Sequence, residues 1–214
     1  MVADHGVKGV GPAVDEQPRQ PGDRAPPERC DCGVGGVLGH RLDGAPGYLG
    51  GVEGGGIWAH GGLEGTPIVE NGFIYVTDGW GSVYKIDAHG GKGVLVWKMD
   101  PKTDHDWAGA VACCGVDNRG VALWNNLVIS HTLDGRLVAT NKETGQVAWQ
   151  RQVADPDKGE VITGAPLIVK DRAISGVAGA EYGIRGWIAA TDLNSQKEVW
   201  RTHTIPGKDE PGAE

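Results

Sequence analysis

This chain of 214 residues is poor in several residue types. It has one Phe and two Met, and no stretch approaches the roughly 18 consecutive apolar residues of a membrane-spanning helix, which predicts no bilayer span. Its 20 Lys and Arg face 28 Asp and Glu and form no basic run, which argues against nucleic acid or an anionic membrane as the main partner. The N-terminus also lacks the charged-then-apolar pattern of a signal peptide.

Gly and Pro are abundant, and they divide the chain into two parts. Residues 1–60 hold 21 Gly and Pro, whereas residues 61–214 hold 28 in 154 positions. The first part has only one Ile and no Phe, so it cannot bury enough apolar surface to offset the entropy of ordering. Residues 1–60 are interpreted as a disordered leader or as an out-of-frame translation of GC-rich DNA. Residues 61–214 are predicted to form the folded part.

From Gly65 onward, short β-rich runs alternate with turn signals. The first two runs flank Asn71-Gly72, a dipeptide that strongly favours a β-hairpin. No segment shows the apolar period of an amphipathic helix, so this part is predicted to be all-β. The predicted strands are residues 67–69, 73–76, 83–86, 94–97, 121–124, 127–130, 137–139, 147–149, 166–169, 173–176, 187–190 and 198–200.

The predicted strands fall into three sets of four, and each set ends in a Trp. Trp97, Trp149 and Trp200 lie 52 and 51 residues apart, and a related turn precedes each of them. Four strands in about 50 residues are typical of a β-propeller blade, and a Trp at one fixed place can pack between neighbouring blades. A β-sandwich with three coincidental Trp residues is the alternative.

Propeller topology brings two long loops to one face. The connection between successive blades and the loop between the second and third strands of a blade emerge on the same side. Residues 100–120 form a long connection of the first kind, and residues 177–186 form a long loop of the second kind. Long loops on a rigid scaffold are where a functional site is expected.

Several residues on that face could carry chemistry. Cys113-Cys114 are either two buried thiols or a vicinal disulfide, which would offer a stiff sulfur surface to a flat ligand. Arg119 could bind a carboxylate through two hydrogen bonds, or it could be an ordinary surface charge. Glu181 lies in a Gly-rich loop that suits a hard cation, although one carboxylate supplies too few ligands.

Two further candidates precede the first strands of blades. Glu64 lies before the first strand of the first blade, and Thr163 lies before the first strand of the third. By the same topology, both side chains are expected to converge with Arg119 near the propeller axis. This convergence is stronger support for a site than any one of the three residues.

Residues from about 63 to the end resemble the alcohol dehydrogenases of the methanol/ethanol type that depend on pyrroloquinoline quinone (PQQ). The resemblance rests on DHDWAGAVACCGVDNRG at 104–120, VITGAP at 161–166 and GAEYGIRG at 179–186. The sequence TGQVAW at 144–149 matches the family's tryptophan-docking repeat. The resemblance implies an eight-bladed quinoprotein β-propeller, of which about three four-stranded blades are present here.

The same resemblance implies a cofactor site. PQQ would lie on the propeller axis above Ca²⁺ or a lanthanide, and a Cys113–Cys114 disulfide would stack on one face of its ring. Glu181 would be a metal ligand. The residues implied to bind or line PQQ are Glu64, Arg119, Thr163, Ala178, Gly179 and Ala180.

The implied function is oxidation of a small primary alcohol to an aldehyde, with electrons passed to a cytochrome c in the periplasm. In the family, the catalytic Asp, further metal ligands and a Trp that covers the cofactor come from later blades, which would follow Glu214. The chain is therefore expected to be an N-terminal-half fragment without turnover of its own.

Two other interpretations stay open. A non-catalytic propeller scaffold, of the kind used in outer-membrane protein assembly, would share the Trp-ended repeats. It would not need the Cys113-Cys114 pair or the loop at 179–186. A broken reading frame would give no stable protein, and protease resistance of the purified chain would distinguish that case from a folded scaffold.

Overall fold

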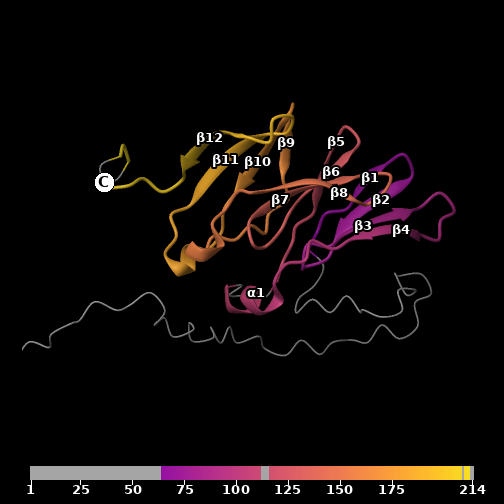
Figure 1. Ribbon diagram of the computed structural model, residues 1–214, viewed down its shortest axis with the longest axis horizontal. Coiled ribbons are helices and arrows are strands. Elements are labelled where there is room, and N and C mark those ends of the chain that lie inside the picture. The colour runs from indigo at the N-terminus through magenta and orange to yellow at the C-terminus, as the bar shows by residue number, and fades with distance from the viewer. Residues whose placement is uncertain (1–63, 112–115, 209, 213–214) are drawn as a thin grey trace, which may run out of the picture.

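Three four-stranded antiparallel sheets make up the folded part of the chain. The computed structural model describes residues 64–111, 116–208 and 210–212, so the predicted leader at 1–60 lies outside the described residues. We call β1–β4 the first sheet, β5–β8 the second and β9–β12 the third. Figure 1 shows them side by side, in chain order from indigo to yellow. The prediction of about three propeller blades is confirmed.

Every predicted run is found as a strand, with ends that differ by up to three residues. The first sheet consists of β1 (Ile68–Glu70), β2 (Phe73–Thr77), β3 (Val83–Asp87) and β4 (Val94–Met99). The second consists of β5 (Val121–Trp124), β6 (Leu127–His131), β7 (Arg136–Asn141) and β8 (Val147–Gln152). The third consists of β9 (Leu167–Val169), β10 (Arg172–Gly176), β11 (Trp187–Asp192) and β12 (Glu198–His203).

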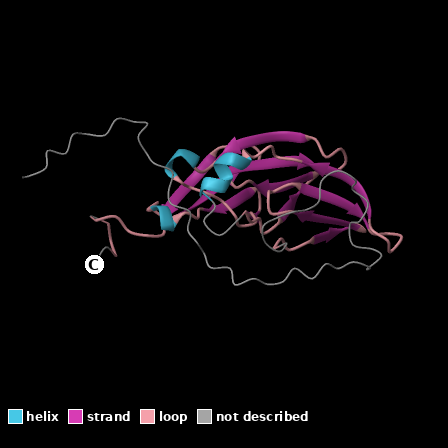
Figure 2. Ribbon diagram, turned by 90° about the horizontal axis from the view of Figure 1, so that it is seen from below, coloured by secondary structure: helices cyan, strands magenta, loops and turns pink. Residues whose placement is uncertain are grey.

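Three short helical segments were not predicted. They are the α-helix α1 (His105–Val111) and the 3₁₀ turns η1 (Pro156–Lys158) and η2 (Ala180–Tyr182). Each is too short to show an apolar period in the sequence. Figure 2 shows all three at one end of the sheets, which is the end predicted to carry the long loops. No helix in the described ranges is long and apolar enough to cross a membrane.

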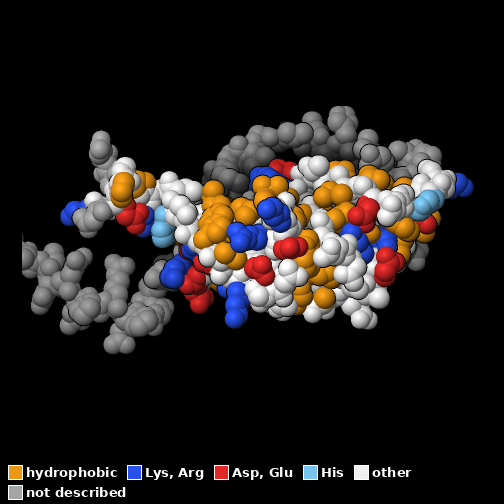
Figure 3. Space-filling model, turned by 90° about the horizontal axis from the view of Figure 1, so that it is seen from above, with side chains coloured by type: hydrophobic (Ala, Val, Ile, Leu, Met, Phe, Trp, Pro, Cys, Tyr) orange, Lys and Arg blue, Asp and Glu red, His pale blue; other side chains and the backbone are white. Residues whose placement is uncertain are grey.

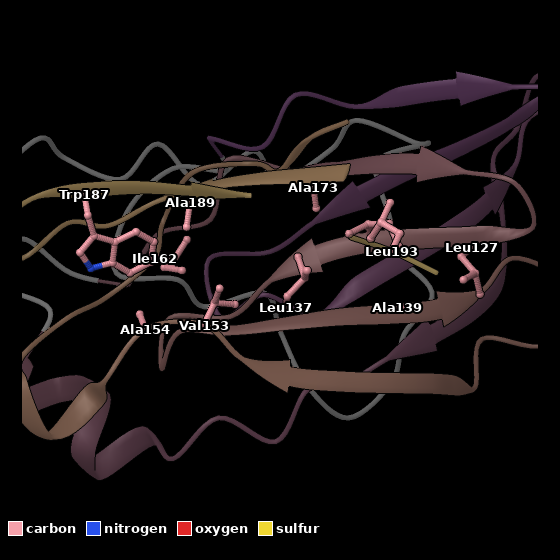
Figure 4. Packing of buried hydrophobic residues seen from close by; sticks show 11 residues of the cluster. Leu127, Leu137, Ala139, Val153, Ala154, Ile162, Ala173, Trp187, Ala189 and Leu193 are labelled. Atoms are coloured by element: carbon pink, nitrogen blue, oxygen red, sulfur yellow. The ribbon is translucent and has the colours of Figure 1, made fainter. Parts of the chain in front are cut away.

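The hydrophobic core lies between neighbouring sheets. Small Ala residues let the second and third sheets approach closely, and larger side chains fill the remaining space. Figure 4 shows this cluster, in which side chains from both sheets point toward one another. Its buried members are Leu127, Ile129, Leu137, Ala139, Val153, Ala154, Ile162, Ala173, Trp187, Ala189 and Leu193.

The exposed surface carries apolar side chains as well. Val69 on β1 and Leu167 on β9 are 67% and 63% exposed, and both belong to the first strands of their sheets. On the face seen in Figure 3, side chains of both charge signs are spread among the hydrophobic ones. That face therefore presents no extended patch of one charge.

Each sheet has a β-bulge at the same place in its last hairpin. The bulge follows directly after the residue that pairs with the repeated Trp of the last strand. The chain thus repeats in backbone register as well as in sequence, which is the behaviour of propeller blades. The Cα partners are Lys85 and Trp97, Ala139 and Trp149, and Ala190 and Trp200.

Trp97 packs the first sheet against the second, as the repeat predicted. Its Nε1 donates a hydrogen bond to the carbonyl oxygen of Lys142 at 2.9 Å, and the Nζ of Lys85 donates to the same oxygen at 2.8 Å. A Cβ added to Gly145 would lie 2.8 Å from atoms of the Trp97 ring. Gly145 is therefore required both for this contact and for its φ of +71°.

We predict that Gln196→Gly stabilises the chain by about 1 kcal/mol, because Gln196 occupies the position of Gly145 in the third sheet with a φ of +59°. The matched reverse change, Gly145→Gln, should destabilise it by roughly 2 kcal/mol or more, since its Cβ would overlap the Trp97 ring. Urea unfolding of both variants measures the two effects. The same change in the free energy of unfolding in both variants would contradict the assignment of Gly145 and Gln196 to one position of the repeat.

Candidate functional site

The segments that lead into the first strands of the three sheets lie side by side. The backbone amide of Thr66 donates to the carbonyl oxygen of Arg119 at 3.2 Å, and the amide of Arg119 donates to the carbonyl oxygen of Thr163 at 2.9 Å. Residues that are 44 and more positions apart in the chain are thus brought into one layer. This is the convergence that the topology predicted for Glu64, Arg119 and Thr163.

The side chains of these three residues meet at Arg119. Its Nη1 donates to Thr163 Oγ1 at 2.6 Å, and its Nη2 donates to Glu64 Oε2 at 3.1 Å. The side chains of Arg119 and Glu64 are about half exposed. The structure therefore places a fixed guanidinium, a hydroxyl and a carboxylate where a ligand in solution can reach them. Whether they bind a cofactor is not tested by this geometry and stays a prediction.

Asp117 belongs to the same cluster, and the sequence analysis missed it. Its Oδ2 lies 2.6 Å from Nη2 of Arg119. Burial raises the pKa of the Asp117 carboxyl above its usual range, the Arg119 guanidinium opposes that shift, and the Glu64 carboxylate raises the pKa again. One available signal was the spacing of two residues between Asp117 and Arg119, which puts both on one side of an extended segment.

Glycines allow the converging segments to approach this closely. A Cβ added to Gly120, which has a φ of +120°, would lie 3.0 Å from the carbonyl oxygen of Thr66. A Cβ added to Gly65 would lie 2.7 Å from Thr77 Oγ1. By contrast, nothing within 4 Å would meet a Cβ added to Gly164, apart from its chain neighbours, so there is open space at Gly164.

The loop at 177–186 is tied to the same end of the third sheet. Ala178 exchanges two backbone hydrogen bonds with Val161, at 2.8 and 3.0 Å. Gly179 has a φ of +122°, and a Cβ there would lie 2.3 Å from the carbonyl oxygen of Gly159. Ala180 and Glu181 follow within η2. The prediction that Glu181 is a metal ligand is not tested here, and among the described residues no group of three His, Cys, Asp or Glu forms a metal site.

Helix α1 leads directly to the predicted Cys113-Cys114 pair, which itself lies outside the described residues. Oδ1 of Asp104 accepts hydrogen bonds from the amides of Asp106 and Trp107, at 2.9 and 3.1 Å, and so caps the helix. The ring of His105 stacks on Trp80 at 3.8 Å between centroids. These contacts hold the start of the long connection against the first sheet.

His131 is a fully buried titratable group behind the cluster. Its Nδ1 lies 2.8 Å from the carbonyl oxygen of Gly164, and its Nε2 lies 2.8 Å from Ser175 Oγ. Burial lowers the pKa of His131 to about 4, although the hydrogen bond to Gly164 acts in the opposite direction. The imidazole is therefore neutral in the folded chain near pH 7.

Comparisons with known proteins point to one family. The family model PQQ_2, described as outer membrane protein assembly factor BamB, matches residues 53–212. The chain is 45% identical to the quinohemoprotein alcohol dehydrogenase ADH IIB of Pseudomonas putida over 146 residues, which cover 68% of this chain and 21% of that protein. The chain thus spans about a fifth of the length of this relative.

Solved structures agree with the sequence comparisons. The quinohemoprotein alcohol dehydrogenase ADHIIG of Pseudomonas putida HK5 matches with a TM-score of 0.64 and 46% identity, over 68% of this chain and 21% of its own. A europium-containing methanol dehydrogenase matches with a TM-score of 0.62 and 37% identity, over 72% of this chain and 27% of its own. The three sheets therefore have the arrangement of blades in these enzymes.

We predict that Glu64→Gln lowers the pKa of Asp117, because it removes a neighbouring negative charge that disfavours ionisation. Arg119→Met should raise the same pKa, because it removes the stabilising positive charge. Carbon-13 NMR titration of the Asp117 carboxyl measures both shifts. An unchanged Asp117 titration in the two variants would show that the cluster does not form in solution.

A second prediction concerns acid stability. The unfolded chain protonates His131 near pH 6.5, whereas the folded chain does so only near pH 4, so proton uptake favours unfolding between these values. The free energy of unfolding should fall by roughly 3 kcal/mol across this window relative to His131→Asn, which has no imidazole. Urea unfolding at a series of pH values tests this. Parallel curves for the two proteins would contradict it.

Proposed function

The chain belongs to the PQQ_2 family, and from that premise we propose that it forms part of the cofactor site of a PQQ-dependent alcohol dehydrogenase. The reaction is oxidation of a small primary alcohol to an aldehyde, with a cytochrome c as electron acceptor, in the periplasm. Similarity at 45% to a quinohemoprotein alcohol dehydrogenase supports this assignment. So do the motifs at 104–120 and 179–186, which a non-catalytic scaffold would not need.

The Arg119 cluster is the observation that carries the proposal. A guanidinium held by a carboxylate and next to a hydroxyl supplies donors that suit the carboxylate and carbonyl oxygens of PQQ. The open space at Gly164, which follows Thr163, leaves room for a ligand at that segment. The guanidinium therefore fits the cofactor's carboxylates in donor type, and the open space at Gly164 gives access, while Glu64 and Asp117 compete with the cofactor for Arg119.

The remaining residues would complete one side of the site. Ala178, Gly179 and Ala180 would line it, since their loop is tied to the segment that leads to Thr163. Glu181 would bind Ca²⁺ or a lanthanide, and the similarity to a europium-containing methanol dehydrogenase supports the lanthanide. A Cys113–Cys114 disulfide would stack against the ring. When bound, PQQ supplies the chemistry, because it accepts the hydride of the alcohol.

The residues of this chain would bind PQQ and orient it. Arg119 donates hydrogen bonds through a planar group whose direction is set by Glu64 and Thr163. A planar donor that is already fixed loses little conformational freedom when a flat, anionic ligand binds. The catalytic base is assigned to no residue of this chain.

A scaffold function is the second candidate, because the matching family model carries the description of an outer-membrane assembly factor. A scaffold of this kind has no reason to bind PQQ. Binding of PQQ by the purified chain therefore separates the two candidates.

We predict that PQQ quenches the tryptophan fluorescence of the chain saturably and that Arg119→Met weakens binding by about 10- to 100-fold. The reason is that a charge-assisted hydrogen bond is worth roughly 1.5–3 kcal/mol. Thr163→Val should weaken binding less, because it removes only a neutral hydroxyl. Fluorescence titration of each variant measures the ratio of dissociation constants.

Arg172→Met is the matched control, since it removes the same charge at the start of β10, at the far end of the third sheet. Its affinity for PQQ should equal that of the wild type. Equal loss in Arg119→Met and Arg172→Met would mean that PQQ is attracted only by net charge. No saturable quenching in the wild type would contradict the proposed function.

A further inference from the structure

His131 lies where the second and third sheets meet, directly behind Arg119 and Thr163. It is the last residue of β6, and both ring nitrogens have partners in or near the third sheet. The carbonyl oxygen of Gly164 can only accept a hydrogen bond, so Nδ1 must carry the proton and donate it. Nε2 then accepts from the hydroxyl of Ser175. The ring is thus fixed in one tautomer and one orientation.

The partner of Nδ1 is next to a cluster residue. Gly164 follows Thr163, so the hydrogen bond to its carbonyl oxygen holds the segment that carries the Thr163 hydroxyl. This segment forms no long strand ladder of its own before β9 begins at Leu167. The imidazole therefore supplies one of the contacts that determine where Thr163 lies.

The backbone of His131 also supports Arg119. Its carbonyl oxygen accepts a hydrogen bond from Nδ2 of Asn118 at 2.9 Å, and Oδ1 of Asn118 accepts one from the amide of Gly120 at 3.0 Å. Asn118 is itself buried, and Arg119 lies between these two bonded residues. His131 thus contacts both segments that the 2.6 Å hydrogen bond between Arg119 and Thr163 joins.

We propose that His131 is a positioning residue for the Arg119–Thr163 pair, with its Nδ1–H bond to the Gly164 carbonyl holding Thr163 in reach of the guanidinium. The consequence for PQQ rests on the proposed function, whereas the placement of Thr163 does not. The hydrogen bonds of His131 reach the pair through Gly164 and Asn118.

The equivalent positions in the other two sheets carry no long polar side chain. Thr77 ends β2 at the position of His131, and its Oγ1 is buried without a hydrogen-bond partner among the described residues. Gly176 ends β10 and has no side chain. Of the three equivalent positions, only that of His131 bridges to the next sheet, and this bridge lies at the Arg119–Thr163 contact.

Two conservative variants separate positioning from bulk packing. The side-chain amide of His131→Asn can reach the place of Nδ1 and keep the donor to Gly164, whereas that of His131→Gln reaches the place of Nε2 and keeps only the Ser175 contact. The first readout is hydrogen exchange of the Arg119 amide, which donates to the Thr163 carbonyl oxygen. The second is the PQQ affinity from fluorescence titration.

We expect His131→Asn to keep the wild-type exchange rate and PQQ affinity within about threefold. We expect His131→Gln to speed exchange at Arg119 at least tenfold and to weaken PQQ binding about tenfold, since one directing hydrogen bond is worth roughly 1 kcal/mol or somewhat more. The amide of Val138, in the middle of β7, is the internal control and should change equally in both variants. Equal effects of the two variants at Arg119 would overturn the proposal.

One measurement needs no variant and so does not depend on folding of a mutant. Nitrogen-15 NMR of the wild-type imidazole should show a protonated Nδ1 and an unprotonated Nε2, and the opposite tautomer would overturn the proposal. If the wild-type chain does not bind PQQ, the proposed function fails. Exchange at Arg119 in the two variants then still decides whether His131 positions the pair.

Discussion

The contact between Trp97 and the turn at Gly145 determines how the first sheet meets the second. The indole approaches the backbone because Gly145 has no Cβ, and its hydrogen bond ends on the Lys142 carbonyl oxygen. This turn lies at one end of the strands, and the segments that carry Glu64 and Arg119 lie at the other. Because strands are stiff, sheets that are fixed at the turn end are also held together at the loop end. The candidate site therefore depends on a packing contact that none of its residues makes.

Repetition of the blade explains why one site can draw on distant residues. Glu64, Arg119 and Thr163 each stand directly before a Gly at the entry to a first strand, so three neighbouring entry segments carry three different donors and acceptors. With Asp117, the cluster holds two carboxylates for one guanidinium. A carboxylate of an incoming ligand must therefore compete with Asp117 or Glu64 for Arg119, which favours a ligand that binds elsewhere in the site as well.

Much of this could be predicted from the sequence because the information is local or repeated. Apolar alternation and turn residues such as Asn71-Gly72 marked all twelve strands, and the Trp spacing marked the blades. Topology alone then predicted that Glu64, Arg119 and Thr163 converge. Helix α1 was missed because seven residues capped by Asp104 show no apolar period.

Asp117 was missed although its partner Arg119 is only two residues away. His131 was missed for a different reason. Its partners Gly164 and Ser175 lie 33 and 44 residues further along the chain, and contacts at such separations depend on how each sheet is rotated against the next, which no local pattern records. In the sequence, His131 resembles any polar residue at a strand end. Its burial between two sheets keeps the imidazole neutral and fixes the direction of its hydrogen bond to Gly164. The two partners limit the imidazole to one tautomer. The carbonyl oxygen of Gly164 can only accept a hydrogen bond, so Nδ1 donates to it, and Nε2 accepts from the hydroxyl of Ser175. A buried polar residue that satisfies both neighbours in this way fixes the geometry of the chain segments it joins, and here one of those segments carries Thr163.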